Sequence, residues 1–336
     1  MIDYISNMTG KKLIPYVSYL VLIILVILFP RLVSDNYMLH LVIVSLTYGA
    51  MVTNWNLNLG YGGVFHIAQP TFFAIGLYSA AISTVRFGIS PWLGLIIGGI
   101  ASFIASIFIG IPALRVKGSY LILLTFAFHF SVSELVFHLS DYTGGCMGLV
   151  VPTFTLGTIR FSPLYLDAYY YIAVIILILS IFTNWAIMRT PMGKSLIAIR
   201  DSEVLASSVG ISIFKSKMNF FAISAFLTGI AGAFFAYYTL VVSPEQLSFH
   251  QITNGFGMIL IGGIGTLFGP ALGSFILTFV SELFRGVEAF RPIIVGLVII
   301  FMLLFAPYGI IHGIKKLVDW VGEEILFRKK HNTFNT

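Results

Sequence analysis

The sequence predicts an all-α polytopic membrane protein with about ten transmembrane segments. Hydrophobic residues make up 58% of the 336 residues and charged residues only 10%, a balance that soluble globular domains do not reach. The apolar residues gather in runs of about 20, the length that an α-helix needs to cross the hydrocarbon core. Because bundled membrane helices share one core, residues 1–336 are expected to form a single transmembrane domain.

The apolar segments follow one another along the whole chain. The first, Leu13 to Phe29, follows two lysines and lacks a small-residue cleavage site, so we interpret it as a retained span and not as a signal peptide. The later segments cover roughly residues 37–59, 64–85, 91–112, 120–139, 163–188, 218–242, 252–283 and 293–311. The 252–283 stretch is too long for one crossing and is interrupted between Gly262 and Pro270. We therefore expect a pair of short helices there, meeting at a bend.

The distribution of Lys and Arg predicts the orientation. With ten crossings, four segments that contain Lys or Arg lie on one side of the membrane. These residues number two in the N-terminus, two in the Arg115/Lys117 turn, five in the 189–217 loop and five in the 313–336 tail. The opposite side carries five: Arg31, Arg86, Arg160, Arg285 and Arg291. Both termini, the loop and the tail are therefore expected in the cytoplasm. Since the basic residues lie at the ends of apolar runs, the net charge of +6 indicates membrane topology and not nucleic-acid binding.

The interval from Arg189 to Lys217 is the long polar stretch around which the spans are arranged. Its glycines, Gly193 and Gly210, bracket a stretch suited to one or two short helices, and Pro191 is suited to begin the first. One interpretation is a solvated connector. The other is a docking surface for a cytosolic partner, with an apolar stripe from Ile197, Leu205 and Val209.

Several chemistries find no support in the sequence. The MGKS stretch at Met192 to Ser195 lacks the first glycine and the preceding strand of a phosphate-binding loop, so any ATP and Mg²⁺ must be bound by another chain. Neither HExxH nor GxSxG occurs, which disfavours an intramembrane enzyme. Cys146 is the single cysteine, so neither an intrachain disulfide nor a cysteine-based metal cluster is expected. The polar, Gly- and Pro-rich stretch of residues 141–162 predicts an ordered external loop.

Polar residues within spans are costly in lipid and are therefore candidates for a solute path. The residues expected to line or flank such a path are Asn58, His66, Gln69, Thr125, His129 and Glu134. Packing between helices is the alternative, because it satisfies such groups equally well. His129 and Glu134 are five apart, which is unfavourable for a pair on one helix face.

Glycines at the break of the 252–283 stretch allow close helix approach in lipid. Packing is the favoured interpretation, and a discontinuous helix that presents backbone groups to a solute is the alternative. The glycines concerned are Gly262, Gly263, Gly265, Gly269 and Gly273.

Six blocks, in order along roughly residues 50–310, carry a family resemblance. They read NLNLGYGGVFHIAQPTFFAIGLYSAA, PALRVKGSYLILLTFAF, TGG, GKSLIAIRDSEVLASSVGI, SPEQLSFHQ and GGIGTLFGPALGS. Together they resemble the membrane permease subunits of branched-chain amino acid ABC importers, of the LivH and LivM type, and the LivM-like half more closely. There are departures where a solute passes: His129-Phe130 replaces a common Gly-Glu pair, with an acid at Glu134, and His66, Gln69 and Pro70 replace the usual residues of the third span.

The resemblance implies a permease domain that works with partners. These are a second permease subunit, identical or different, two cytosolic ATP-binding subunits and an extracytoplasmic solute-binding protein. The block that resembles the family's coupling helix contributes Gly193, Ala198, Arg200, Glu203, Ala206 and Gly210. The solute is a branched-chain amino acid or a related small polar solute, with a urea- or amide-type ABC importer as one alternative. A stand-alone channel or secondary transporter is the other, but the sparse charge within the spans favours the importer.

Overall fold

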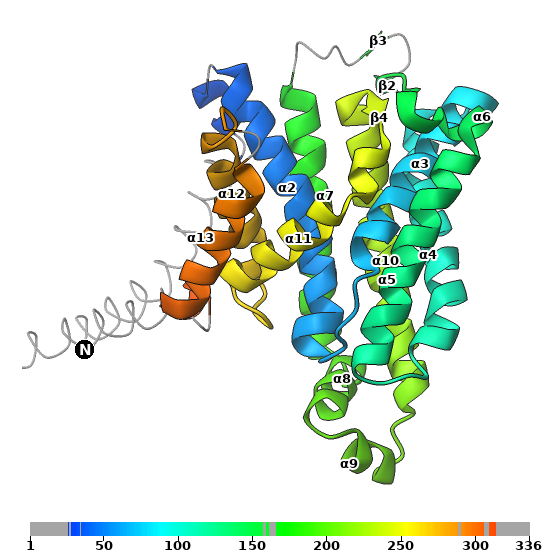
Figure 1. Cartoon of the computed structure of the whole chain (residues 1–336), viewed down its shortest axis with the longest axis vertical. Coiled ribbons are helices and arrows are strands. Elements are labelled where there is room, and N and C mark those ends of the chain that lie inside the picture. The colour runs from blue at the N-terminus through cyan, green and yellow to red at the C-terminus, as the bar shows by residue number, and fades with distance from the viewer. Residues whose placement is uncertain are drawn as a thin grey trace, which may run out of the picture.

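The computed structural model describes residues 26, 28–33, 35–156, 159–160, 166–287, 290–305 and 309–313. Its longer helices stand side by side as one bundle, and two short helices project from one end (Figure 1). The α-helices are α2 (Asn36–Asn56), α3 (Gln69–Phe87), α4 (Pro91–Ala113), α5 (Ser119–His138), α6 (Ser140–Thr143), α7 (Asp167–Arg189), α8 (Pro191–Asp201), α9 (Glu203–Ser208), α10 (Ile213–Thr239), α11 (Phe249–Gly262), α12 (Gly269–Leu283) and α13 (Arg291–Phe305).

The helices confirm an all-α polytopic membrane protein. Six segments of the described chain are long and apolar enough to cross a membrane: Asn36–Tyr61, Pro91–Ala113, Ser119–His138, Asp167–Arg189, Ile213–Thr239 and Pro292–Gly313. The predicted number of about ten crossings is not established by these six. The first predicted span and the basic tail fall almost entirely outside the described residues.

Helices α2 and α10 form the buried centre of the bundle. Helix α10 packs along both α3 and α4, while α2 packs against α7 and α12. The backbones of α3 and α10 meet where Gly76 faces Gly229, since a Cβ on Gly76 would lie 2.2 Å from the Gly229 carbonyl oxygen. Small residues at this contact provide the close packing that replaces the hydrophobic driving force in lipid.

The break in the 252–283 stretch is present as predicted. Helix α11 ends at Gly262, the chain turns, and α12 begins at Gly269. The turn requires positive φ angles of 114° at Gly263 and 73° at Gly265, which favour glycine. Helices α11 and α12 then pack against each other as an antiparallel hairpin (Figure 1).

The third span begins later than the sequence predicts. A π-helical turn, Leu57–Tyr61, ends α2, and residues 62–68 are not helical before α3 begins at Gln69. Three contacts from other segments hold this stretch, namely Val64 N–H to the Asn58 carbonyl (2.9 Å), Ile67 N–H to Thr125 Oγ1 (3.1 Å) and Trp55 Nε1 to the His66 carbonyl (3.0 Å). These tertiary partners replace the helical hydrogen bonds that a continuous span would form.

The predicted external loop lies at the end of the bundle opposite α8 and α9 (Figure 1). Its described part contains α6, a 3₁₀ turn at Gly145–Met147, and the short strands β1 (Leu149–Val150), β2 (Thr155–Leu156) and β3 (Ile159–Arg160). Strand β1 pairs antiparallel with β4 (Val241–Val242), directly after α10, and β2 pairs with β3. The β1–β4 pair fastens the loop to the end of the central helix.

Candidate functional site

The polar 189–217 loop folds into the two helices that project from the bundle, α8 and α9 (Figure 1). Pro191 occupies the first turn of α8, and Thr190 caps it by accepting a hydrogen bond from the Gly193 N–H (3.4 Å). A Cβ on Gly193 would lie 2.4 Å from the Ile187 carbonyl oxygen. Gly193 therefore lets α8 fold back closely against the end of α7.

Helix α9 presents an apolar surface away from the bundle. Val204 is 77% exposed, Leu205 69% and Val209 74%. Of the predicted apolar stripe, Leu205 and Val209 face outward, whereas Ile197 on α8 is only half-exposed. Val204, which the prediction did not include, completes the exposed surface. Ala206 points the other way and is buried, and Gly210 closes the helix with a positive φ of 85°.

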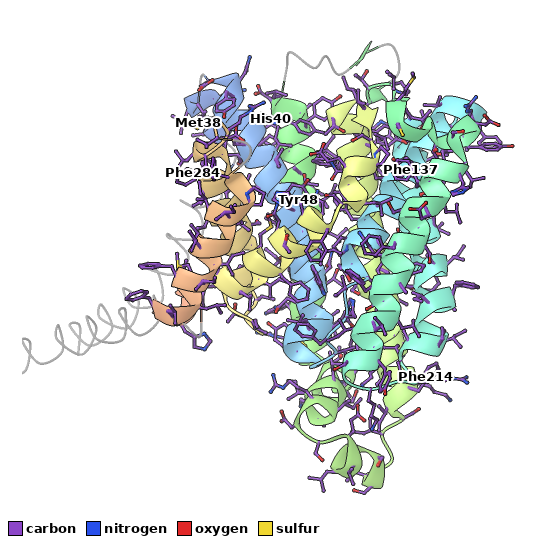
Figure 2. All side chains as sticks on the ribbon, in the orientation of Figure 1. Met38, His40, Tyr48, Phe137, Phe214 and Phe284 are labelled. Carbon is purple, nitrogen blue, oxygen red and sulfur yellow. The ribbon has the colours of Figure 1, made fainter. Side chains whose placement is uncertain are left out.

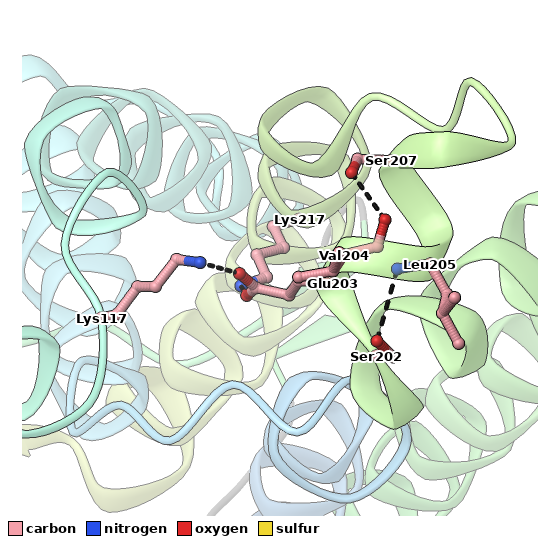
Figure 3. Close-up of polar contacts among 7 residues, drawn as sticks. All are labelled: Lys117, Ser202, Glu203, Val204, Leu205, Ser207 and Lys217. Carbon is pink, nitrogen blue, oxygen red and sulfur yellow. Dashed lines mark hydrogen bonds and ion pairs between the residues drawn. The ribbon is translucent and has the colours of Figure 1, made fainter.

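Glu203 fastens α9 to the bundle. Its carboxylate forms ion pairs with Lys117, in the turn between α4 and α5, and with Lys217 on α10 (Figure 3). Hydrogen bonds from Lys117 and then from Lys217 hold the pKa of Glu203 below its ordinary value. Ser202 caps the same helix by accepting from the Leu205 N–H (3.3 Å). Glu203 thus acts within this chain, between three segments.

Arg200 connects α8 to the end of α2. Its guanidinium pairs with Asp201 Oδ1 (3.1 Å from Nη2) and donates from Nη1 to the Gly60 carbonyl (3.4 Å). A Cβ on Gly63 would lie 2.7 Å from Arg200 Cγ, so the arginine stem covers the turn after α2. Within this chain the ion pair of Arg200 is therefore with its neighbour Asp201. Ala198, on the same helix, is half-buried.

Three of the predicted path residues meet around α10. Asn58 Nδ2 donates to Ser224 Oγ (2.6 Å), and Gln69 Nε2 donates to the Ser224 carbonyl (3.2 Å) and to Thr228 Oγ1. His66 is fully buried, with its ring edge-on to Phe221 at a centroid distance of 4.9 Å. Ser224 and Thr228 on α10 thus serve as the hydrogen-bond partners of Asn58 and Gln69.

The remaining path residues divide into two places. Thr125 is buried and bonds to Ile67, while His129 contacts Thr71 Oγ1 through Nδ1 and the Leu247 carbonyl through Nε2, each at 2.9 Å. The Glu134 side chain is 69% exposed on the outer surface of α5 beside His138. The structure therefore brings five of the six candidates into the interior and leaves Glu134 apart from them.

The predicted glycines lie at the crossing of α11 and α12 and in the turn between them. A Cβ on Gly273 would lie 1.8 Å from the Met258 carbonyl oxygen, and one on Gly262 would lie 1.9 Å from that of Gly269. Gly265 instead contacts Gly60 at the end of α2. The five glycines thus occupy helix-to-helix and turn-to-helix contacts.

A cavity of about 290 Å³, which the sequence did not predict, lies beside the start of α11. Its lining includes Glu245, Gln246, His250, Gln251 and Asn254, all from the stretch SPEQLSFHQITN. That stretch was recognised only as part of a family block. The amide, imidazole and carboxylate groups that gather in this part of an apolar chain are the signal that could have predicted the cavity.

Comparison with known proteins agrees with this architecture. Residues 37–307 match the family described as the permease component of branched-chain amino acid transport systems. The chain belongs to this family. It is 27% identical to the high-affinity branched-chain amino acid transport system permease protein LivM of Escherichia coli (strain K12), over 86% of this chain and 73% of that protein.

More distant similarities extend to other import permeases. The chain is 23% identical to a probable branched-chain amino acid transport permease protein LivH of Methanocaldococcus jannaschii, over 76% of this chain and 84% of that protein. It is 30% identical to the autoinducer 2 import system permease protein LsrC of an Enterobacter species (strain 638), over 38% of this chain and 40% of that protein. No solved structure matches.

Proposed function

We propose that this chain is the transmembrane permease domain of an ATP-binding-cassette importer for branched-chain amino acids or a related small polar solute. It crosses the membrane about ten times, with both termini and α8–α9 in the cytoplasm. Membership of the permease family supports this role. The observation that carries it is the exposed apolar surface of α9, formed by Val204, Leu205 and Val209 on a helix pair that projects from an apolar bundle. Such a surface on a polar projection is typical of a docking site.

The proposed complex contains further chains. Two cytosolic ATP-binding subunits hold ATP and Mg²⁺ and receive α8–α9, a second permease subunit completes the pore, and an extracytoplasmic binding protein delivers the solute. Glu203 and Arg200 transmit movement of the ATPase inward, because they join α8–α9 to α10, to the α4–α5 turn and to the end of α2.

Purification of the tagged chain from its native membrane tests this assignment. We expect an ATP-binding subunit to co-purify and vesicles of the complex to take up leucine with ATP. Leu205→Asp should abolish co-purification, while Ser212→Asp, a matched exposed position at the N-cap of α10, should retain it. Uptake by the chain alone, driven by an ion gradient, would instead assign it as a secondary transporter.

A further inference from the structure

The cavity beside the start of α11 is lined by residues of α2, α10, α11 and α12 and of the turn that precedes α11. His40 and Tyr48 follow one another along its α2 wall, with His40 nearer the end opposite α8–α9 (Figure 2). Its volume of about 290 Å³ is close to the lower limit of small-ligand pockets in proteins, about 300 Å³. The space therefore suits a solute of a few heavy atoms.

The lining is amphipathic. On one side Gln251 Nε2 donates to Tyr48 Oη (2.7 Å) and to Gln246 Oε1 (2.6 Å), which forms a polar network. Leu41, Val44, Phe235, Met258 and Leu277 supply an apolar surface to the same cavity. A ligand with one polar end and one aliphatic end matches both parts.

The fixed charge of the lining is negative. Glu245 and Glu282 line the cavity, and no lysine or arginine does so among the described residues. Glu282 is paired with Arg285 (3.1 Å) and accepts from Tyr37. Glu245 forms no ion pair within the described part of the chain, so one carboxylate is left to attract a cation.

Two further acceptors lack partners. Asn254 Oδ1 and Thr278 Oγ1 are buried and make no hydrogen bond within the described structure, although both residues line the cavity. Asn254 Nδ2 is already paired with His250 Nε2 at 3.0 Å, which fixes the amide with its oxygen free. An alkylammonium group carries three N–H donors, one for each of the three acceptor groups that Glu245, Asn254 and Thr278 supply.

We propose that this cavity binds a small aliphatic primary ammonium solute, with the ammonium group at Glu245 and the hydrocarbon part against the wall of Leu41 and Leu277. A zwitterionic aliphatic amino acid belongs to this class. The assignment rests on the proposed function in identifying the ligand as the cargo of the importer, but the binding itself requires neither the ATPase nor the binding protein.

Calorimetry on the full chain in lipid nanodiscs, without partners, tests the proposal with three probes. These are leucine, 3-methylbutan-1-amine, which lacks the carboxylate, and 4-methylpentanoate, which lacks the ammonium group. We expect leucine and the amine to bind and the acid to bind at least about tenfold more weakly, the loss expected for a charge-assisted hydrogen bond. Failure of leucine and the amine to bind, or equal binding of the acid, would overturn it.

Variants separate this site from a general effect on folding. Glu245→Gln and, independently, Thr278→Val should weaken amine binding by about tenfold and several-fold respectively, with unchanged melting temperature. Asp167→Asn removes an exposed carboxylate at the same end of the bundle and should leave binding unchanged. If both cavity variants bind the amine normally, the cavity is not the site. If the ATPase co-purifies but the cavity does not bind the amine, this inference fails and the proposed function stands. If the cavity binds the amine but no ATPase co-purifies, the proposed function fails instead.

Discussion

Asn56 holds the backbone of Gly265 across the bundle, 209 positions along the chain. Its Oδ1 accepts from the Gly265 N–H at 2.8 Å, and its Nδ2 donates to the neighbouring Thr266 carbonyl at 2.9 Å. The side chain thus satisfies both a donor and an acceptor in the turn between α11 and α12. Because Asn56 directly precedes the π-helical turn that Arg200 contacts, the end of α2 joins the cytosolic helices to the broken hairpin.

Replacing Asn56 with Leu should destabilise the protein by about 1–3 kcal/mol, because two backbone groups of the hairpin turn lose their partners in a partly buried place. The melting temperature of the purified chain in detergent measures the effect. Asn219→Leu is the matched control, since Asn219 is exposed on α10. Equal melting temperatures for the two variants would mean that the turn does not depend on Asn56.

Glu203 predicts a pH-dependent contribution to stability. Its pKa is lowered by Lys117 and Lys217, so the folded state binds the proton less tightly than the unfolded state, whose carboxyl has a pKa of 4.5. The stabilisation is therefore complete above pH 4.5 and disappears as the pH falls through the lowered folded value. The difference in melting temperature between wild type and Glu203→Gln should shrink correspondingly in acid, and a constant difference would contradict this account.

The two lysines should contribute unequally. The side chain of Lys217 is 14% exposed and that of Lys117 is 77% exposed. Exposed ion pairs contribute about 0–1 kcal/mol because solvent screens them, so Lys117→Met should have little effect on the free energy of unfolding. Lys217→Met should cost more, because it leaves Glu203 without its better-shielded partner. Equal losses measured by thermal denaturation would show that burial does not rank the pairs.

Gly273 should tolerate no side chain. A Cβ there would lie 1.8 Å from the Met258 carbonyl, which is backbone and cannot move aside, so α11 and α12 would have to separate. Gly273→Ala should cost about 1–3 kcal/mol, as overpacking does, in spite of the higher helix propensity of alanine. Gly286→Ala is the control, because a Cβ at that position would have nothing within 4 Å. A melting temperature equal to that of the control would contradict the close contact.

The features that the sequence predicted are those set by local composition. The polar block after Arg189 contrasts with its apolar neighbours, Pro191 is suited to a helix start, and the glycines from Gly262 onward interrupt a stretch too long for one span. All three signals are read from neighbouring residues, so the projecting helices and the broken hairpin were both predictable.

The features that were missed depend on partners in other segments of the chain. Residues 64–68 are apolar enough for a span, but Trp55, Asn58 and Thr125 supply their hydrogen bonds, which no local pattern reveals. The direction in which a side chain points was not predictable either. The sequence did not show that Ala206 on α9 faces the bundle or that Glu134 on α5 faces away from it. Without a sharp apolar face on these elements, only the packed structure decides orientation.

His66 and His129, the two histidines that are buried in the described part of the chain, should respond oppositely to the same substitution. His129 has a partner at each ring nitrogen, Thr71 and the Leu247 carbonyl, so His129→Phe should destabilise the protein by about 1–3 kcal/mol by leaving those groups unpaired. Both ring nitrogens of His66 are buried without a hydrogen-bond partner in the described structure.

His66→Phe should therefore leave the melting temperature unchanged or raise it, because an apolar ring of similar shape removes two unsatisfied polar atoms among Trp55 and Phe221. A residue that lowers the stability of the folded protein is expected to be retained because it contributes to activity. Solute uptake by the reconstituted complex should therefore fall in the His66→Phe variant. Thermal denaturation and uptake measured on one preparation check both parts. A stable variant with normal uptake would place His66 outside the solute path, and a destabilised one would mean that its ring nitrogens have partners in the membrane.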